Sequence, residues 1–97
     1  MRPLLPGDLD FAVRVLLARP PSDWKGLAKQ LFAEAQTAHD YRRSVGRPHP
    51  DFGTGSVMSA AARYSLAPLP PTCEPTYCRA LRQILDTILE QQINSGA

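Results

Sequence analysis

The sequence is poor in the residues that mark disulfide-rich, metal-binding or membrane-spanning proteins. Its 97 residues include two cysteines, two histidines and one tryptophan, and aromatic residues make up 7% of the chain. No stretch approaches the roughly 20 consecutive apolar residues that a membrane-spanning helix needs. The pair Leu4-Leu5 is too short for the core of a signal peptide. We therefore expect a cytoplasmic protein with no membrane contact.

The few cysteines and histidines also argue against a metal site. Cys73 and Cys78 lie five positions apart across a proline-rich turn, and the chain has no second cysteine pair. His39 and His49 would complete a set of four ligands, but the cysteines of a zinc site usually lie closer together, in repeated pairs. Two reduced thiols are the better interpretation, so we expect no metal and no cofactor.

The sequence contains no group of residues typical of catalysis. His39 and Asp40 are neighbours in a helical pattern, where adjacent side chains do not face each other. No serine lies in the strained turn that exposes a nucleophile. The run Gly53-Thr54-Gly55-Ser56 precedes a helical pattern as a phosphate loop does, but it lacks the lysine of a nucleotide site and follows no strand. We therefore expect no catalytic residue and no enzyme activity.

Prolines divide the chain into helical stretches. The ten prolines are clustered, and between the clusters apolar residues recur at three- and four-residue spacing, with no alternating strand pattern. The sequence predicts one all-α domain over 1–97, with helices at about 8–18, 22–45, 56–64 and 75–92. Asp8 and Ser56 are expected to cap the two short helices. The two long helices are expected to form a long hairpin, and 93–97 a flexible tail.

The two long helices each carry an apolar stripe. A domain of 97 residues buries a modest fraction of its surface, so a helical protein of this length is favoured to self-associate. We expect the stripes to form the interface of a homo-oligomer. The interface residues predicted on this basis are Trp24, Leu27, Leu31, Ala35, Leu81, Ile84, Leu85 and Ile88.

Positive charge is concentrated in one segment. The formal net charge is +2, which is too small for the whole surface to bind nucleic acid. Residues 42–63 nevertheless combine one acidic residue, Asp51, with four arginines: Arg42, Arg43, Arg47 and Arg63. In the rest of the chain, acidic and basic residues nearly balance. An anion-binding surface is therefore expected in segment 42–63.

The same segment is built as a turn between two helices. Gly46 can end a helix in the left-handed conformation, and Pro48 and Pro50 prevent its continuation. The glycine-rich run that follows leads into a helix start, where free backbone N–H groups and guanidinium groups together favour a phosphate. The residues predicted to contact a phosphodiester are Arg42, Arg43, Arg47, His49, Ser56 and Arg63. A plainer alternative stays open, because cations at a helix C-terminus also stabilise the helix dipole.

Several motifs of the chain together resemble a known family. The central motif is Asp40-x-x-Arg43-x-x-Gly46-Arg47-x-His49-Pro50-x-x-Gly53-x-Gly55-Ser56-Val57-Met58-x-Ala60-Ala61. It follows an N-terminal Arg2-Pro3-Leu4-Leu5-Pro6-x-Asp8-Leu9 and precedes a Pro-Pro strap. Over most of its length the chain resembles small alphaproteobacterial proteins encoded with gene transfer agents. That resemblance implies a small terminase subunit, which forms a helical oligomer, binds double-stranded DNA and hands it to the large terminase ATPase-nuclease.

The sequence departs from many phage small terminases in one respect. Its first two helical stretches supply no recognition helix rich in Arg, Asn and Gln, so DNA binding without strong sequence specificity is expected. The function predicted is therefore that of a DNA-packaging accessory protein. The alternative is a helical adaptor with no DNA role, whose basic turn docks on an acidic protein partner and whose last helix lies in a partner's groove. A small metal-dependent enzyme is the least favoured class.

Overall fold

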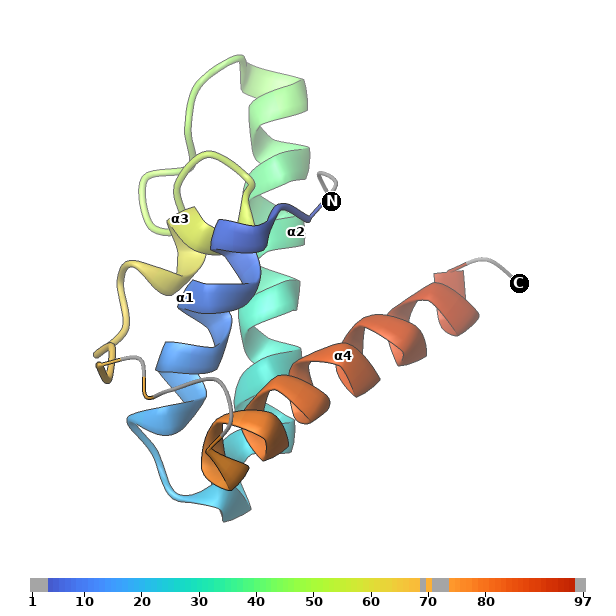
Figure 1. Ribbon diagram of the computed structural model, residues 1–97. Helices are drawn as coiled ribbons and strands as arrows, with labels where there is room; N and C mark the ends of the chain where they lie inside the picture. The colour runs from blue at the N-terminus through green and yellow to red at the C-terminus, as the bar shows by residue number, and fades with distance from the viewer. Residues whose placement is uncertain (1–3, 69, 71–73, 96–97) are drawn as a thin grey trace.

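The computed structural model describes residues 4–68, 70 and 74–95 (Figure 1). The described chain forms α1 (Pro6–Leu17), a 3-10 helix η1 (Pro21–Asp23), α2 (Trp24–Val45), α3 (Val57–Ala61) and α4 (Pro75–Ser95). Within these residues there is no strand, and His49 and Gly53 form an isolated antiparallel bridge. The all-α fold class predicted from the sequence is confirmed. None of the described helices is long and apolar enough to span a membrane.

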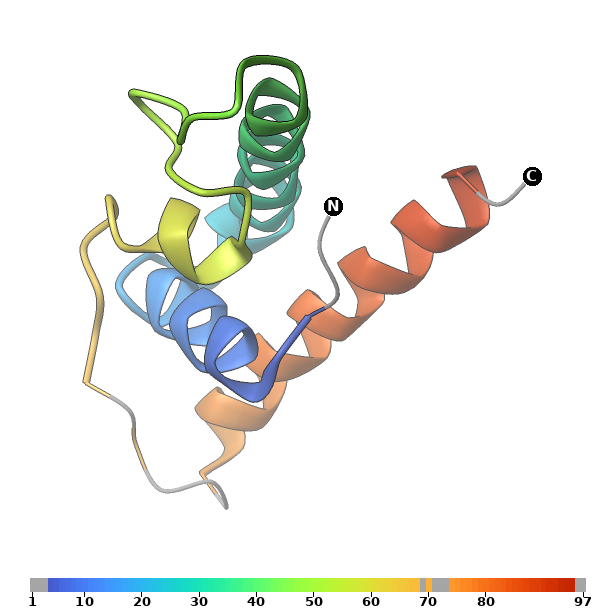
Figure 2. The same cartoon turned by 90° about the horizontal axis from the view of Figure 1, so that it is seen from above.

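Helix α1 lies at the centre of the fold. It packs against α2, α3 and α4 (Figures 1 and 2). Its buried apolar side chains point to more than one side, and they are Ala12, Val13, Val15 and Leu16. A short helix that is apolar on more than one side has to be covered, and here the chain itself provides the cover.

Helix α1 begins two residues earlier than the sequence predicted. Pro6 occupies the first turn, where its fixed φ and missing N–H are tolerated. Asp8 therefore does not precede the helix as its cap but lies in its third position, where one carboxylate oxygen accepts a hydrogen bond from the backbone N–H of Leu5 at 2.8 Å. The prediction of Asp8 at the N-cap was wrong by three positions, although its carboxylate still binds a free amide of the first turn.

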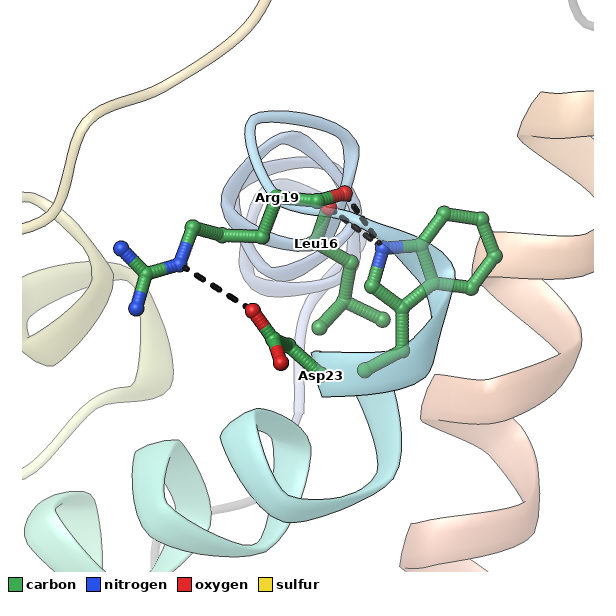
Figure 3. A network of polar contacts seen from close by, with 4 residues as sticks. Leu16, Arg19 and Asp23 are labelled. Carbon is green, nitrogen blue, oxygen red and sulfur yellow. Dashed lines mark hydrogen bonds and ion pairs between the residues drawn. The ribbon is translucent and has the colours of Figure 1, made fainter.

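Helix α2 is joined to α1 by a tight proline-containing turn. The indole Nε1 of Trp24 donates hydrogen bonds to the carbonyl oxygens of Leu16 at 2.6 Å and Arg19 at 3.0 Å, which close the C-terminal end of α1 (Figure 3). At its other end α2 stops at Gly46, whose φ of +80° is left-handed and whose N–H donates to the carbonyl of Arg42 at 2.8 Å. The predicted glycine end of this helix is confirmed.

The two long helices do not form an antiparallel hairpin. Both start at the same end of the molecule and diverge, so that the C-terminal half of α4 projects away from the other helices (Figure 1). Trp24 and Arg79, near the starts of the two helices, line one shallow hollow, and further along Lys29 Nζ lies 3.9 Å from a carboxylate oxygen of Glu90. The hairpin was a wrong expectation because the chain returns through α3 to the start of α2 before α4 begins.

Helices α3 and α4 also differ from their predicted lengths. Helix α3 starts after the predicted cap, because the hydroxyl oxygen of Ser56 accepts a hydrogen bond from the N–H of Ser59 at 3.1 Å. It ends at Ala61 instead of Tyr64, since the N–H of Tyr64 bonds the carbonyl of Ala61 in a tighter turn at 3.0 Å. Helix α4 continues to Ser95, three residues into the predicted tail, as no Gly or Pro interrupts it before Gly96. Residues 96–97 lie outside the described residues.

Candidate nucleic-acid interface

Three arginines are exposed at the C-terminal end of α2. Arg42 and Arg43 lie in its last turn, and Arg47 follows the capping Gly46. All three residues are exposed, and within the described chain none of them is in an ion pair. Arg43 lines a shallow hollow with Asp40 and Ser44. The three guanidinium groups also lie where the helix dipole favours a cation, so they stabilise α2 by about 0.3–1 kcal/mol each at low salt.

The turn after these arginines is organised around the ring of His49. The ring stacks on Phe52, with centroids 4.7 Å apart, and meets Tyr41 edge-on at 4.9 Å. Its Nδ1 accepts hydrogen bonds from the backbone N–H groups of Asp51 at 2.9 Å and Phe52 at 3.1 Å. Nδ1 therefore carries no proton in this arrangement and cannot donate to a phosphate. The prediction of His49 as a phosphate contact is limited to Nε2, and the main role of the residue is to hold the turn.

Arg63 joins this turn from the end of α3. Its guanidinium carbon lies 5.4 Å from the centre of the Phe52 ring, a cation–π contact worth about 0.5–1 kcal/mol at an exposed site. The planar group remains exposed, so its outer N–H groups can still reach an anion. We refer to Tyr41, His49, Phe52 and Arg63 as the stacked cluster. It fixes the loop between α2 and α3 from both ends.

The glycine-rich run does not form an open phosphate cradle. Gly53 and Gly55 have φ values of +86° and +103°, which only glycine adopts easily. A Cβ on Gly55 would lie 2.9 Å from the Cα of His39, so this glycine lets the loop pack directly on the backbone of α2. The N–H of Thr54 donates to the hydroxyl of Ser59 at 2.9 Å. The two glycines are therefore needed for close packing and for their backbone conformation.

The N-terminus of α3 already holds an anion, which belongs to the chain itself. The second carboxylate oxygen of Asp8 accepts a hydrogen bond from the backbone N–H of Met58 at 2.8 Å, and Asp8 is 4% exposed. With the amide of Ser59 bonded to Ser56, the start of α3 has two of its free donors satisfied. Ser56 caps the helix through its hydroxyl oxygen, and its contact with DNA, made by the hydroxyl proton, stays a prediction. Sequence reasoning missed Asp8 because its partner lies 50 residues away.

The structure places most of the predicted interface residues inside the single chain. Five of them are buried in its core: Trp24, Leu27, Leu31, Ala35 and Ile84. Leu81 and Ile88 are partly buried and pack against that core. Leu85 is 44% exposed, and Leu89, one turn further on, is 60% exposed. The prediction that the five core residues lie in the interface between subunits is therefore corrected, because the same chain already covers them.

A polar network fixes the chain just after α3. The hydroxyl of Tyr64 donates to a carboxylate oxygen of Glu34 at 2.6 Å, and the side-chain amide of Gln30 donates to both groups at 3.1 Å. Burial and the hydrogen bond to the Glu34 carboxylate raise the pKa of the Tyr64 phenol to about 12. The network ties this segment to α2 and thereby helps to position the adjacent Arg63.

The described residues contain no group of three or more His, Cys, Asp and Glu side chains that could hold a metal ion. Cys78 is exposed near the start of α4 and takes part in no disulfide within the described chain. Cys73, the other cysteine of the predicted thiol pair, lies outside the described residues.

The chain belongs to the family described as Domain of unknown function (DUF7742), whose model matches residues 2–88. No curated protein and no solved structure matches the chain. The description of the family names no activity, so the function is inferred from the surface described above.

Proposed function

We propose that this member of the family is a non-enzymatic DNA-packaging accessory protein that resembles a phage-type small terminase subunit. It acts in the cytoplasm as a homo-oligomer, binds double-stranded DNA without strong sequence specificity and presents it to a large terminase ATPase-nuclease. The resemblance of the central motif to proteins encoded with gene transfer agents supports this proposal. The observation that carries it is the group of three exposed arginines, Arg42, Arg43 and Arg47, at the end of α2.

These arginines suit the DNA backbone better than a base sequence. Guanidinium groups bind phosphate oxygens in a planar, bidentate manner, and phosphate contacts set position without reading sequence. The three arginines lie at and just beyond the C-terminal end of α2, whereas the recognition helix of a helix-turn-helix protein contacts base edges with its N-terminal residues. Three phosphate contacts per chain give a slope of about −2.7 in a plot of log K against log salt. Binding by one subunit is therefore weak, and an oligomer raises the avidity.

The test compares two variants of equal charge change. In Arg43→Glu/Arg47→Glu the proposed surface changes from basic to acidic, whereas Lys25→Glu/Lys29→Glu makes the same change at exposed positions near the start of α2. Binding to two unrelated duplexes is measured by fluorescence anisotropy over a series of salt concentrations. The parent and the lysine variant are expected to bind both duplexes alike, and the arginine variant to lose binding. Equal loss in the two variants would show that overall charge, and not this surface, is responsible.

A helical adaptor is the second candidate function. The observation that favours the adaptor is the Asp8 carboxylate at the start of α3. It occupies a backbone N–H group there, so fewer donors are left for a phosphate than the sequence predicted. The side-chain cations that remain fit an acidic protein surface as well. If the parent binds neither duplex at low salt, the adaptor function takes the place of the DNA-binding one.

A further inference from the structure

The C-terminal half of α4 carries two exposed leucines. Leu85 is 44% exposed and Leu89 is 60% exposed, while Ile84 and Thr87 of the same helix are buried in the core. Residues four apart lie on one face of a helix, so the two leucines form a continuous apolar strip. The helix projects away from α1, α2 and α3 in this region (Figure 2), which leaves the strip accessible to another molecule.

The charges beside this strip are separated along the helix. Arg79 and Arg82 precede Leu85, whereas Asp86 and Glu90 follow it, and all four residues are exposed. At 100° per residue, Arg82 and Asp86 lie about 60° and 100° from Leu85 on the same side of the strip. One flank of the apolar strip is therefore positive at its start and negative at its end.

We propose that α4 pairs with α4 of a second copy of the chain, antiparallel about a two-fold axis at Leu85. This pairing sets Leu85 against its equivalent and Leu81 level with Leu89 of the second copy. An antiparallel two-fold pair brings the same flank of both helices together. Arg82 then lies about 3 Å along the axis from Asp86 of the second copy, at 1.5 Å per residue. Arg79 comes nearly level with Glu90 of the second copy in the same way.

The charges select this orientation over the parallel one. In a parallel pair in register, opposite flanks of the two helices meet, so that Arg82 and Asp86 lie beside Leu81 and Ile88 of the second copy and have no partner of opposite charge there. The antiparallel pair supplies such partners, and opposite charges across an interface fix register and orientation. Glu90 already lies near Lys29 of its own chain, but that pair is exposed and weak. The Arg82–Asp86 contact is therefore the one to test.

The α4 pair is offered as the contact between subunits of the proposed homo-oligomer, so this inference rests on the proposed function. Its test is made without DNA, so a failure of the pairing and a failure of DNA binding are read separately. The single variants Arg82→Glu and Asp86→Arg each place like charges at both symmetric contacts. When the two variants are mixed, the glutamate introduced in one chain faces the arginine introduced in the other. At the second contact the unchanged Asp86 and Arg82 face each other, so both contacts become attractive.

The experiment measures mass by sedimentation equilibrium for the full chain. We expect the parent to dimerise, each single variant to dimerise at least about tenfold more weakly, and the equimolar mixture to recover the parental dissociation constant. Arg47→Glu, the same charge change at the end of α2, is the control and should dimerise as the parent does. Circular dichroism checks that every variant keeps its helical signal.

Three results would overturn the pairing. The first is a parent that remains monomeric at about 100 μM, a concentration at which a dissociation constant of 10 μM or so would be evident. The second is dimerisation of Arg82→Glu or Asp86→Arg with the parental constant. The third is a mixture that associates no better than its two components, which would exclude the antiparallel contact even if the chain self-associates through another surface.

Discussion

Replacement of Asp8 by alanine tests how the chain holds α1 and α3 together. The carboxylate accepts one hydrogen bond from the N–H of Leu5 and one from the N–H of Met58. Loss of the carboxylate that caps the part-buried amide of Leu5 costs about 1 kcal/mol. Loss of a hydrogen bond to a charged group, here at the part-buried amide of Met58, costs about 1.5–3 kcal/mol. We therefore expect Asp8→Ala to lower the free energy of unfolding by about 2–4 kcal/mol.

The assay is urea unfolding at neutral pH, followed by circular dichroism. The matched control is Asp10→Ala, because Asp10 lies on the same helix and its carboxylate has no hydrogen bond in the described part of the chain. Asp8→Asn should fall between the two, since an amide oxygen can replace only one of the two acceptors. A loss of less than about 0.5 kcal/mol for Asp8→Ala, within the range of ordinary surface substitutions, would refute this assignment. So would a loss equal to that of Asp10→Ala.

Two further predictions concern the partly buried phenol of Tyr64 and a pair of glycines. The pKa of Tyr64 is raised from 10.0 to about 12, so its protonated form stabilises the fold; that contribution is complete below pH 10 and is lost as pH rises through about 12. Absorbance titration near 295 nm should show one tyrosine ionising last, and Tyr64→Phe should remove that step alone; an unchanged last step would show that Tyr64 is not the tyrosine with the raised pKa. Gly26 lies within α2 with nothing within 4 Å of an added Cβ, whereas Gly55 has a φ of +103° and abuts His39. Gly26→Ala should therefore stabilise the fold by about 0.5–1 kcal/mol, and Gly55→Ala should destabilise it by more than about 1 kcal/mol. Thermal unfolding of both variants should show a raised midpoint for the first and a lowered midpoint for the second.

Features set by neighbouring residues could be predicted from the sequence. Gly46 ends α2 and Ser56 caps α3 as expected, because each acts on backbone groups within four residues. The apolar stripes were also found, since helical spacing reveals which face is covered. Spacing does not reveal what covers the face. For that reason Trp24 and Ile84 were assigned to contacts between subunits, although they belong to the core of one chain.

The part of the candidate site that was missed depends on residues far apart in the sequence. The sequence indicates that a helix starts after Ser56, but not that α1 brings Asp8 to its free amides. Likewise, His49 next to prolines and arginines suggests a donor for phosphate. Only the folded turn shows its Nδ1 accepting two backbone hydrogen bonds. The three arginines at the end of α2 and just after it are exposed as the prediction requires, because an exposed helix end needs no tertiary information.

The stacked cluster has a consequence for how any partner of the arginines binds. Ordering one residue of a free loop costs about 1–2 kcal/mol in backbone entropy. In this chain the loop after α2 is ordered during folding, by the ring of His49 against Phe52 and by the bridge between His49 and Gly53. Arg47 thus lies at the start of a preorganised loop, and Arg63 packs on the same loop from beyond α3. Association then requires no coupled folding, so its rate is set by electrostatic attraction and diffusion.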